Sequence, residues 1–195
     1  MNLPNILTIS RIFLTFIFVA VLLRDGIEAK IIAAVIFAIA SLTDLLDGYF
    51  AKKRKQVTDF GKLMDPIADK FLTLAAFFVF ARMNVIAFWM FALVAGREIV
   101  VTIFRLVAKK RKGAALAAER GGKYKTVFQI VTIGVILLFL ILRESEWAAN
   151  WPSSLFYQWY TAIDILMLIT IILTLTSGSL YLWKNRRVIH APSFS

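Results

Sequence analysis

Five of the twelve acidic residues lie between positions 44 and 69 of a 195-residue chain that is 60% hydrophobic. The first two, Asp44 and Asp47, are three residues apart. The last two, Asp65 and Asp69, are four apart, so each pair shares one face if its segment is helical. Asp59, among Lys and Arg, is interpreted as a solvated loop charge. Four carboxylates gathered in apolar surroundings repel one another unless a cation neutralises them.

The four paired aspartates offer only oxygen donors, which Mg²⁺ and Mn²⁺ prefer. Such ions commonly bind a substrate phosphate as well, and two ions can hold both sides of a displacement. The pattern therefore suggests chemistry on a phosphoanhydride. Small residues one helical turn from these acids, Gly48, Ala51 and Gly61, leave room for a flat group. Close packing of membrane helices is the alternative explanation for them.

The elements that must position these acids are long apolar segments. We predict an all-α integral membrane protein with six transmembrane helices, at about 5–23, 31–50, 65–81, 85–107, 126–142 and 160–183. The third segment is short for a span and either begins near Thr58, with Pro66 bending it, or has Pro66 in its first turn. No repeat or linker divides the chain, so residues 1–195 are predicted to form one domain.

Basic residues predict the orientation in the membrane. They concentrate at 52–55, 109–112, 120–125 and 184–187, all at one end of the predicted helices. Short basic loops stay in the cytoplasm, so both termini and the acidic pairs should face it. The formal charge of +11 is then explained by anionic lipid heads, and no nucleic-acid partner is expected.

A second group of charges indicates an anion site in the fourth and fifth predicted spans. It consists of Arg97, Arg105, Lys123 and Lys125. Arg105 follows Arg97 by eight residues, which returns it to roughly the same helical face, nearer the cytoplasm. These cations could hold the phosphate of an acceptor. Alternatively, Arg97 pairs with the neighbouring Glu98, and the lysines extend to lipid heads.

The acidic segment resembles the CDP-alcohol phosphotransferase family, whose signature is D-x2-D-G-x2-A-R-x8-9-G-x3-D-x3-D. The matching residues are Asp44, Asp47, Gly48, Ala51, Gly61, Asp65 and Asp69, and Lys52 stands where the signature has Arg. Arg forms a rigid fork and Lys a compact point charge, so this difference could weaken a contact that depends on geometry.

The resemblance implies a six-helix, homodimeric membrane enzyme that moves a phosphatidyl or related group from a CDP-linked donor to an alcohol and releases CMP. It implies that Asp44, Asp47 and Asp65 bind two Mg²⁺ or Mn²⁺ ions, with Asp69 as a ligand or the general base. The expected donor-binding residues are Gly48, Ala51 and Gly61 at the cytidine, Lys52 at the diphosphate, and Thr8 and Arg11 in the first helix.

Further segments, LPNILTISR, DPIADK, REIVVT and GGKYKT, are similar to the bacterial phosphatidylglycerophosphate synthases within that family. This implies CDP-diacylglycerol as donor, glycerol 3-phosphate as acceptor, and a multi-pass protein of the bacterial cell (inner) membrane. A cardiolipin synthase of the CDP-alcohol type and a phosphatidylinositol phosphate synthase are the alternatives with the same chemistry. A divalent-cation transporter is the alternative from another class, but it predicts acids near the middle of the bilayer.

Overall fold

The computed structural model describes the backbone of residues 3–54, 59–112 and 121–186, and the side chains of residues 10–43, 70–107 and 124–186. All of the regular elements in this part of the chain are helices. They are α1 (Leu3–Leu22), α2 (Ile27–Arg54), α3 (Asp59–Arg82), α4 (Phe88–Lys112), α5 (Gly121–Arg143), the short 3₁₀ helix η1 (Glu146–Asn150) and α6 (Ser153–Asn185).

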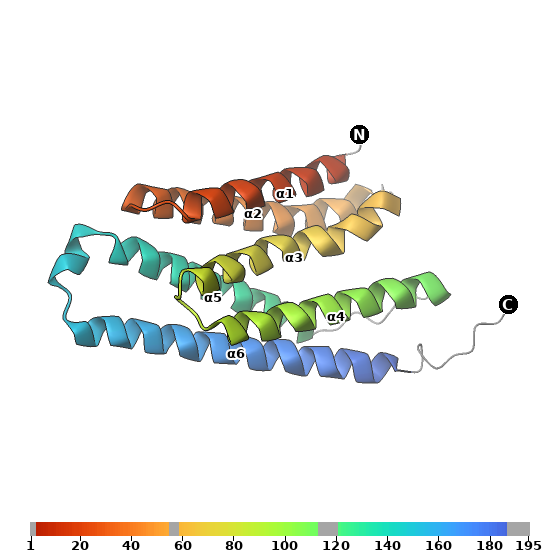
Figure 1. Ribbon diagram of the computed structural model, residues 1–195. Coiled ribbons are helices and arrows are strands. Elements are labelled where there is room, and N and C mark those ends of the chain that lie inside the picture. Colours follow the sequence, from red (N-terminus) through yellow and green to blue (C-terminus); the bar gives the residue numbers. More distant parts are fainter. Residues whose placement is uncertain (1–2, 55–58, 113–120, 187–195) are drawn as a thin grey trace.

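The six long helices run side by side and alternate in direction along the chain (Figure 1). α1 packs against α2 and α3, while α4 packs against α3 and α6, and α5 packs against α2 and α6. The connections 23–26, 83–87 and 144–152 lie at one end of the bundle. The beginning of α1 and the end of α6 lie at the opposite end, which also holds the acidic motif. That end is called the motif end below.

Each of the six predicted spans corresponds to one long helix, apart from residues 23 and 85–87 at the ends of two spans, so the all-helical fold is confirmed for the described residues. α3 begins at Asp59, which is therefore the first residue of a helix and not a loop residue as predicted. This start agrees with the alternative in which the third segment begins near Thr58, and Pro66 consequently lies inside α3 and not in its first turn. α6 also begins earlier than predicted, because Ser153 to Tyr160 continue the same helix.

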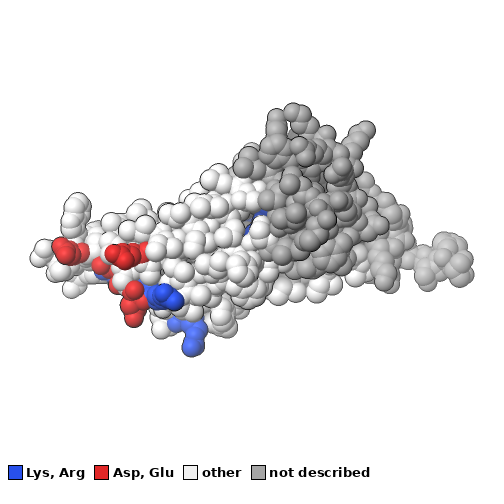
Figure 2. Space-filling view, turned by 90° about the horizontal axis from the view of Figure 1, so that it is seen from above, with Lys and Arg blue, Asp and Glu red and all other residues white. Residues whose placement is uncertain are grey.

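The surface of the bundle is apolar where a soluble protein would be charged. Phe13, Phe16, Ile99, Ile103 and Ile172 are among many large apolar side chains that are exposed. Figure 2 shows the face that lies at the top of Figure 1. Acidic side chains gather near one end of this face, and most of the remaining described surface in this view is uncharged. Within the described residues, two helical segments, Tyr124–Arg143 and Ser153–Asn185, are long and apolar enough to cross a membrane. The other four predicted spans stay predictions.

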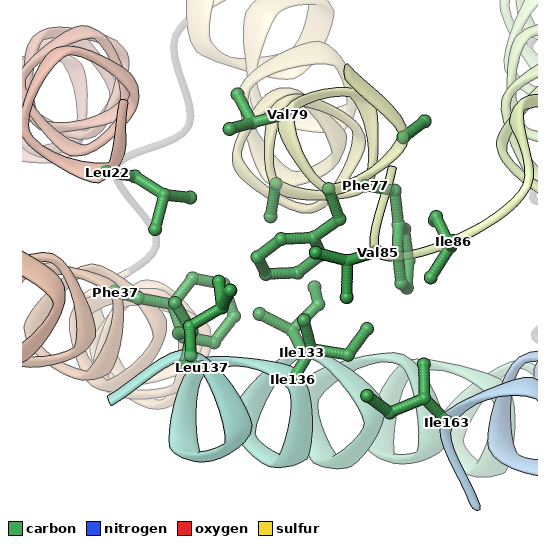
Figure 3. Packing of buried hydrophobic residues seen from close by; sticks show 14 of the residues in the cluster. Leu22, Phe37, Phe77, Val79, Val85, Ile86, Ile133, Ile136, Leu137 and Ile163 are labelled. Carbon is green, nitrogen blue, oxygen red and sulfur yellow. The ribbon is translucent and has the colours of Figure 1, made fainter. Parts of the chain in front are cut away.

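The apolar core lies toward the end with the short connections. Phe77 and Phe80 of α3 are fully buried in one cluster that also contains Phe18 of α1 and Ile133 and Ile136 of α5. Figure 3 shows such side chains from several helices meeting between α3 and α5. A fully buried side chain of this size stabilises the fold by about 1.5–3 kcal/mol. This packing fixes the relative positions of the helices whose other ends carry the charged residues.

The turn between α1 and α2 joins these helices tightly. Gly26 has φ +96°, a conformation that L-residues rarely adopt and that glycine, which has no side chain, adopts readily. Lys30 is buried, and its Nζ donates to the carbonyl oxygens of Leu22, the last residue of α1, and of Arg24 in the following turn. A cation at a helix C-terminus satisfies open carbonyl groups and opposes the negative end of the helix dipole. Lys30 therefore has a structural role at the end distant from the acidic motif.

Candidate active site

The four motif aspartates belong to two helices that contact each other. Asp44 and Asp47 lie in the second half of α2, and Asp65 and Asp69 lie in the first half of α3. The prediction that each pair lies on a helix is therefore confirmed. Their side chains lie outside the described residues, so the predicted metal-binding and proton-accepting roles stay predictions.

Most predicted donor contacts also fall outside the side chains that the structure describes. They are Gly48, Ala51 and Lys52 of α2, Gly61 of α3 and Thr8 of α1. Lys123, at the beginning of α5, is outside as well. Arg11 of α1 is described, and its side chain is buried at 4% exposure. A buried guanidinium toward the motif end of α1 agrees with a role inside the bundle and not with an arginine at the lipid interface.

The chemistry of the motif fits a hard divalent cation. All four candidate donors are carboxylates, and the chain has no cysteine. Among the described side chains, no group of three or more His, Asp or Glu could hold a metal ion. The aspartates of the motif are therefore the residues to which a Mg²⁺ or Mn²⁺ site is assigned in the proposal below.

A buried ionic cluster lies next to this motif along α3. Its centre is the Glu98 carboxylate of α4, which is 2% exposed. Lys70, the residue after Asp69, donates to Glu98 Oε2, and Lys125 of α5 donates to Glu98 Oε1. Arg97 Nη1 donates to Oε1 at 3.1 Å, and Gln129 Nε2 lies 3.4 Å from the same oxygen. We call these five residues the Glu98 cluster.

The Glu98 cluster carries more positive than negative charge. Two lysines and one arginine surround a single carboxylate, which leaves a formal charge of +2 on these residues. The side chains of Arg97 and Lys125 are only 8% and 6% exposed, so water screens them little. Uncompensated charge in such surroundings is costly, and an anion reduces that cost. The excess positive charge of the Glu98 cluster therefore favours an anion nearby.

The side chain of Arg97, which belongs to α4, also contacts the neighbouring helix α6. Arg97 Nη2 donates to Ser177 Oγ at 2.7 Å, and Ser177 Oγ in turn donates to the carbonyl oxygen of Thr174 at 3.2 Å. The arginine side chain also passes directly over Gly178 of α6. α6 thus supplies part of the surroundings of a charged residue of α4.

Arg105 lies apart from Arg97 and Lys125, the other two predicted acceptor residues whose side chains the structure describes. Arg97 and Lys125 meet at Glu98, whereas the Arg105 guanidinium lies 5.4 Å from the centre of the Tyr181 ring. Tyr181 is buried and also contacts Phe104 edge to face. Arg105 and Arg97 therefore lie on the same face of α4, as their spacing predicted, and this face meets α6. Among the side chains that the structure describes, no ion pair joins Arg105 to the Glu98 cluster.

Three members of this region were not identified from the sequence, namely Lys70, Gln129 and Ser177. Lys70 and Gln129 carried a usable signal, because an acidic residue inside an apolar span requires cationic or polar partners. Gln129 follows Lys125 by four residues, which places both on one face of α5. On α6, the buried polar residues Thr170, Thr174, Ser177 and Tyr181 recur at spacings of four, three and four, which marks an inward polar face.

Comparison with known proteins adds an independent observation. Residues 1–176 match the CDP-alcohol phosphatidyltransferase family over most of the chain. The chain belongs to this family. The resemblance predicted from the acidic motif is therefore confirmed, and the membership covers α1 to α5 and most of α6.

Several curated relatives of this chain are named CDP-diacylglycerol–glycerol-3-phosphate 3-phosphatidyltransferase. The protein of Bacillus subtilis (strain 168) is 35% identical over 196 aligned residues, which cover 94% of this chain and 95% of the relative. That of Salmonella paratyphi A is 33% identical over 80% of this chain and 85% of the relative. The protein of Haemophilus influenzae is 35% identical over 70% of this chain and 75% of the relative.

Proposed function

We propose that this protein transfers the phosphatidyl group of CDP-diacylglycerol to glycerol 3-phosphate. The acceptor hydroxyl oxygen forms a bond to the β-phosphorus, and the bond from that phosphorus to the oxygen shared with CMP breaks. The products are phosphatidylglycerol phosphate and CMP. Family membership and the common name of three relatives at 33–35% identity support this reaction.

The acidic motif is proposed to form the reaction centre. Asp44, Asp47 and Asp65, with Asp69 as a further ligand or the base, would hold two Mg²⁺ or Mn²⁺ ions, which supply charge neutralisation at the diphosphate. Asp69 accepts the proton of the attacking hydroxyl, a role that requires a carboxylate within hydrogen-bonding reach of the acceptor.

The remaining motif residues are assigned to the donor. The small residues of α2 and α3 leave space for cytidine, and Lys52 contacts the diphosphate. Thr8 and Arg11 of α1 complete this side of the site. The assignment rests on the family motif and on the position of these residues in α1, α2 and α3. The residues are Gly48, Ala51, Lys52, Gly61, Thr8 and Arg11.

The Glu98 cluster is the structural observation that supports an acceptor with a phosphate monoester, and the names of the relatives support glycerol 3-phosphate as that acceptor. Its formal charge of +2 is buried, and its Lys70 directly follows Asp69 of the motif. A phosphate monoester carries about −1.5 to −2 charges at neutral pH, which matches this excess. We therefore assign the acceptor phosphate to Arg97 and Lys125, with Lys123 and Arg105 nearer the motif end.

The proposal includes a membrane topology. All six long helices cross the bacterial cell membrane, and both termini and the active site face the cytoplasm. The apolar surface of the bundle supports insertion, and the basic segments at the motif end support the orientation. The enzyme is proposed to act as a homodimer of this single domain.

The alternatives are less well supported. A neutral or zwitterionic acceptor gives no reason for a buried cluster with excess positive charge. Phosphatidylglycerol, the acceptor of a cardiolipin synthase, carries no monoester phosphate dianion. A divalent-cation transporter is not favoured, because the curated relatives are named as transferases.

The test is CMP release by the purified, detergent-solubilised protein with CDP-diacylglycerol and Mg²⁺. Glycerol 3-phosphate, phosphatidylglycerol and inositol phosphate are supplied in separate reactions. We expect release with glycerol 3-phosphate. Release only with another acceptor would refute the choice of acceptor and retain the transfer chemistry. Absence of release with every acceptor, under both Mg²⁺ and Mn²⁺, would refute the proposed reaction.

A further inference from the structure

Gly178 of α6 lies beneath the side chain of Arg97 with almost no space between them. A Cβ added to Gly178 would lie 2.5 Å from Arg97 Nε, 3.0 Å from its Cγ and 3.3 Å from its Cδ. Real Cβ atoms essentially never approach another heavy atom within 3.0 Å. Glycine is required at position 178 because the Arg97 side chain approaches closely, and not because of the backbone conformation of Gly178.

A shift of the middle of the Arg97 side chain would disturb the hydrogen bonds that its two terminal nitrogens donate. Nη1 is bonded to Glu98 Oε1 at 3.1 Å, and Nη2 is bonded to Ser177 Oγ at 2.7 Å. Because the guanidinium is planar and rigid, displacing Nε moves both terminal nitrogens. The added methyl group would therefore weaken two charge-assisted hydrogen bonds at once.

We propose that Ser177 and Gly178 are positioning residues that hold Arg97 where it meets the acceptor phosphate. This inference rests on the proposed function and assigns a role in acceptor binding to α6. A long arginine side chain loses considerable rotamer freedom when it binds an anion. Prior fixation by α6 removes part of that entropic cost, which is the general advantage of a preorganised site.

Two glycine variants test the role of Gly178. Gly178→Ala introduces the methyl group under Arg97, whereas Gly134→Ala on α5 introduces it where no atom lies within 4 Å. Both changes place the better helix former in a helix, so they are matched in backbone effect. We would measure KM for glycerol 3-phosphate, KM for CDP-diacylglycerol and kcat by CMP release with Mg²⁺, together with the melting temperature in detergent.

We expect Gly178→Ala to raise KM for glycerol 3-phosphate about tenfold or more. This is the loss of binding affinity that is typical when a hydrogen bond to a charged group is weakened. Its KM for CDP-diacylglycerol should stay within about twofold of the parent, and Gly134→Ala should match the parent in both constants. Ser177→Ala should also raise KM for glycerol 3-phosphate, because it removes the hydroxyl that accepts from Arg97 Nη2 and adds no atom near Arg97. Equal changes in both KM values, or a Gly178→Ala variant indistinguishable from Gly134→Ala, would overturn the inference.

A second readout separates this inference from the proposed function. Inorganic phosphate should raise the melting temperature of the parent and of Gly134→Ala more than that of Gly178→Ala. If the parent releases no CMP with glycerol 3-phosphate, the proposed reaction fails, while this difference between the two variants would still support the positioning role. Equal stabilisation of all three proteins by phosphate would overturn that role whatever the reaction is.

Discussion

Replacing Glu98 by glutamine removes the one carboxylate at the centre of the Glu98 cluster and keeps the size of the side chain. Lys70, Arg97 and Lys125 then lie together without the anion that each of them contacts in the structure. Because the glutamate is 2% exposed, water does not replace the lost charge. We expect Glu98→Gln to destabilise the folded protein.

The size of the effect follows from competing electrostatic contributions. Each contact between unit charges at about 4 Å contributes about 4 kcal/mol at an effective dielectric constant of 20. Part of this attraction is offset, because the variant no longer desolvates a carboxylate and its amide oxygen still accepts a hydrogen bond. Breaking a buried ion pair by removing one partner costs about 3–5 kcal/mol. For a protein of this length, that loss lowers the melting temperature by roughly 6–20 °C.

The assay is thermal unfolding of the parent and the variant in the same detergent, without substrates. Glu144→Gln is the matched control, because Glu144 pairs with Arg143 at 3.9 Å while both side chains remain more than a quarter exposed. Such a pair contributes about 0–1 kcal/mol, so this control should melt close to the parent. A Glu98→Gln variant that melts within about 2 °C of the parent would refute the reasoning from buried charge.

Three further predictions concern the reaction. Asp69→Asn should abolish CMP release and leave the melting temperature near that of the parent; normal turnover would exclude Asp69 as the base. Lys125→Met should raise KM for glycerol 3-phosphate by about 10- to 100-fold, because the acceptor loses a hydrogen bond from a charged group. Its KM for CDP-diacylglycerol should stay within about twofold of the parent. Equal effects on both substrates would contradict a phosphate contact. Chelation by EDTA should stop CMP release, and added Mg²⁺ or Mn²⁺ should restore it; activity that persists in EDTA would contradict a divalent metal site.

Much of the fold could be predicted from local sequence. Long apolar segments predicted six helices, and all six are present. Helix ends were predicted less well, because the residues at the ends of a membrane helix are polar and resemble loop residues. Asp59 illustrates this, since it was predicted as a loop residue and is the first residue of α3.

The acidic motif could be identified because its residues are close together in sequence and their spacing repeats the helical turn. The partners of Arg97 could not be identified in the same way. Glu98 is its neighbour in the chain, but Ser177 lies 80 positions away and Lys125 belongs to another helix. Local periodicity shows which face of a helix is polar and does not show which helix that face meets.

The sequence by itself determined the class of protein, the helical segments and the family, because composition, apolar length and a motif of fixed spacing are local properties of the chain. The tertiary structure decided which charges share a site. Packing of α3, α4 and α5 brings Lys70, Glu98 and Lys125 together, and contact between α4 and α6 places Arg97 over Gly178. These pairings depend on helix-to-helix distances that are fixed only when the apolar core is packed.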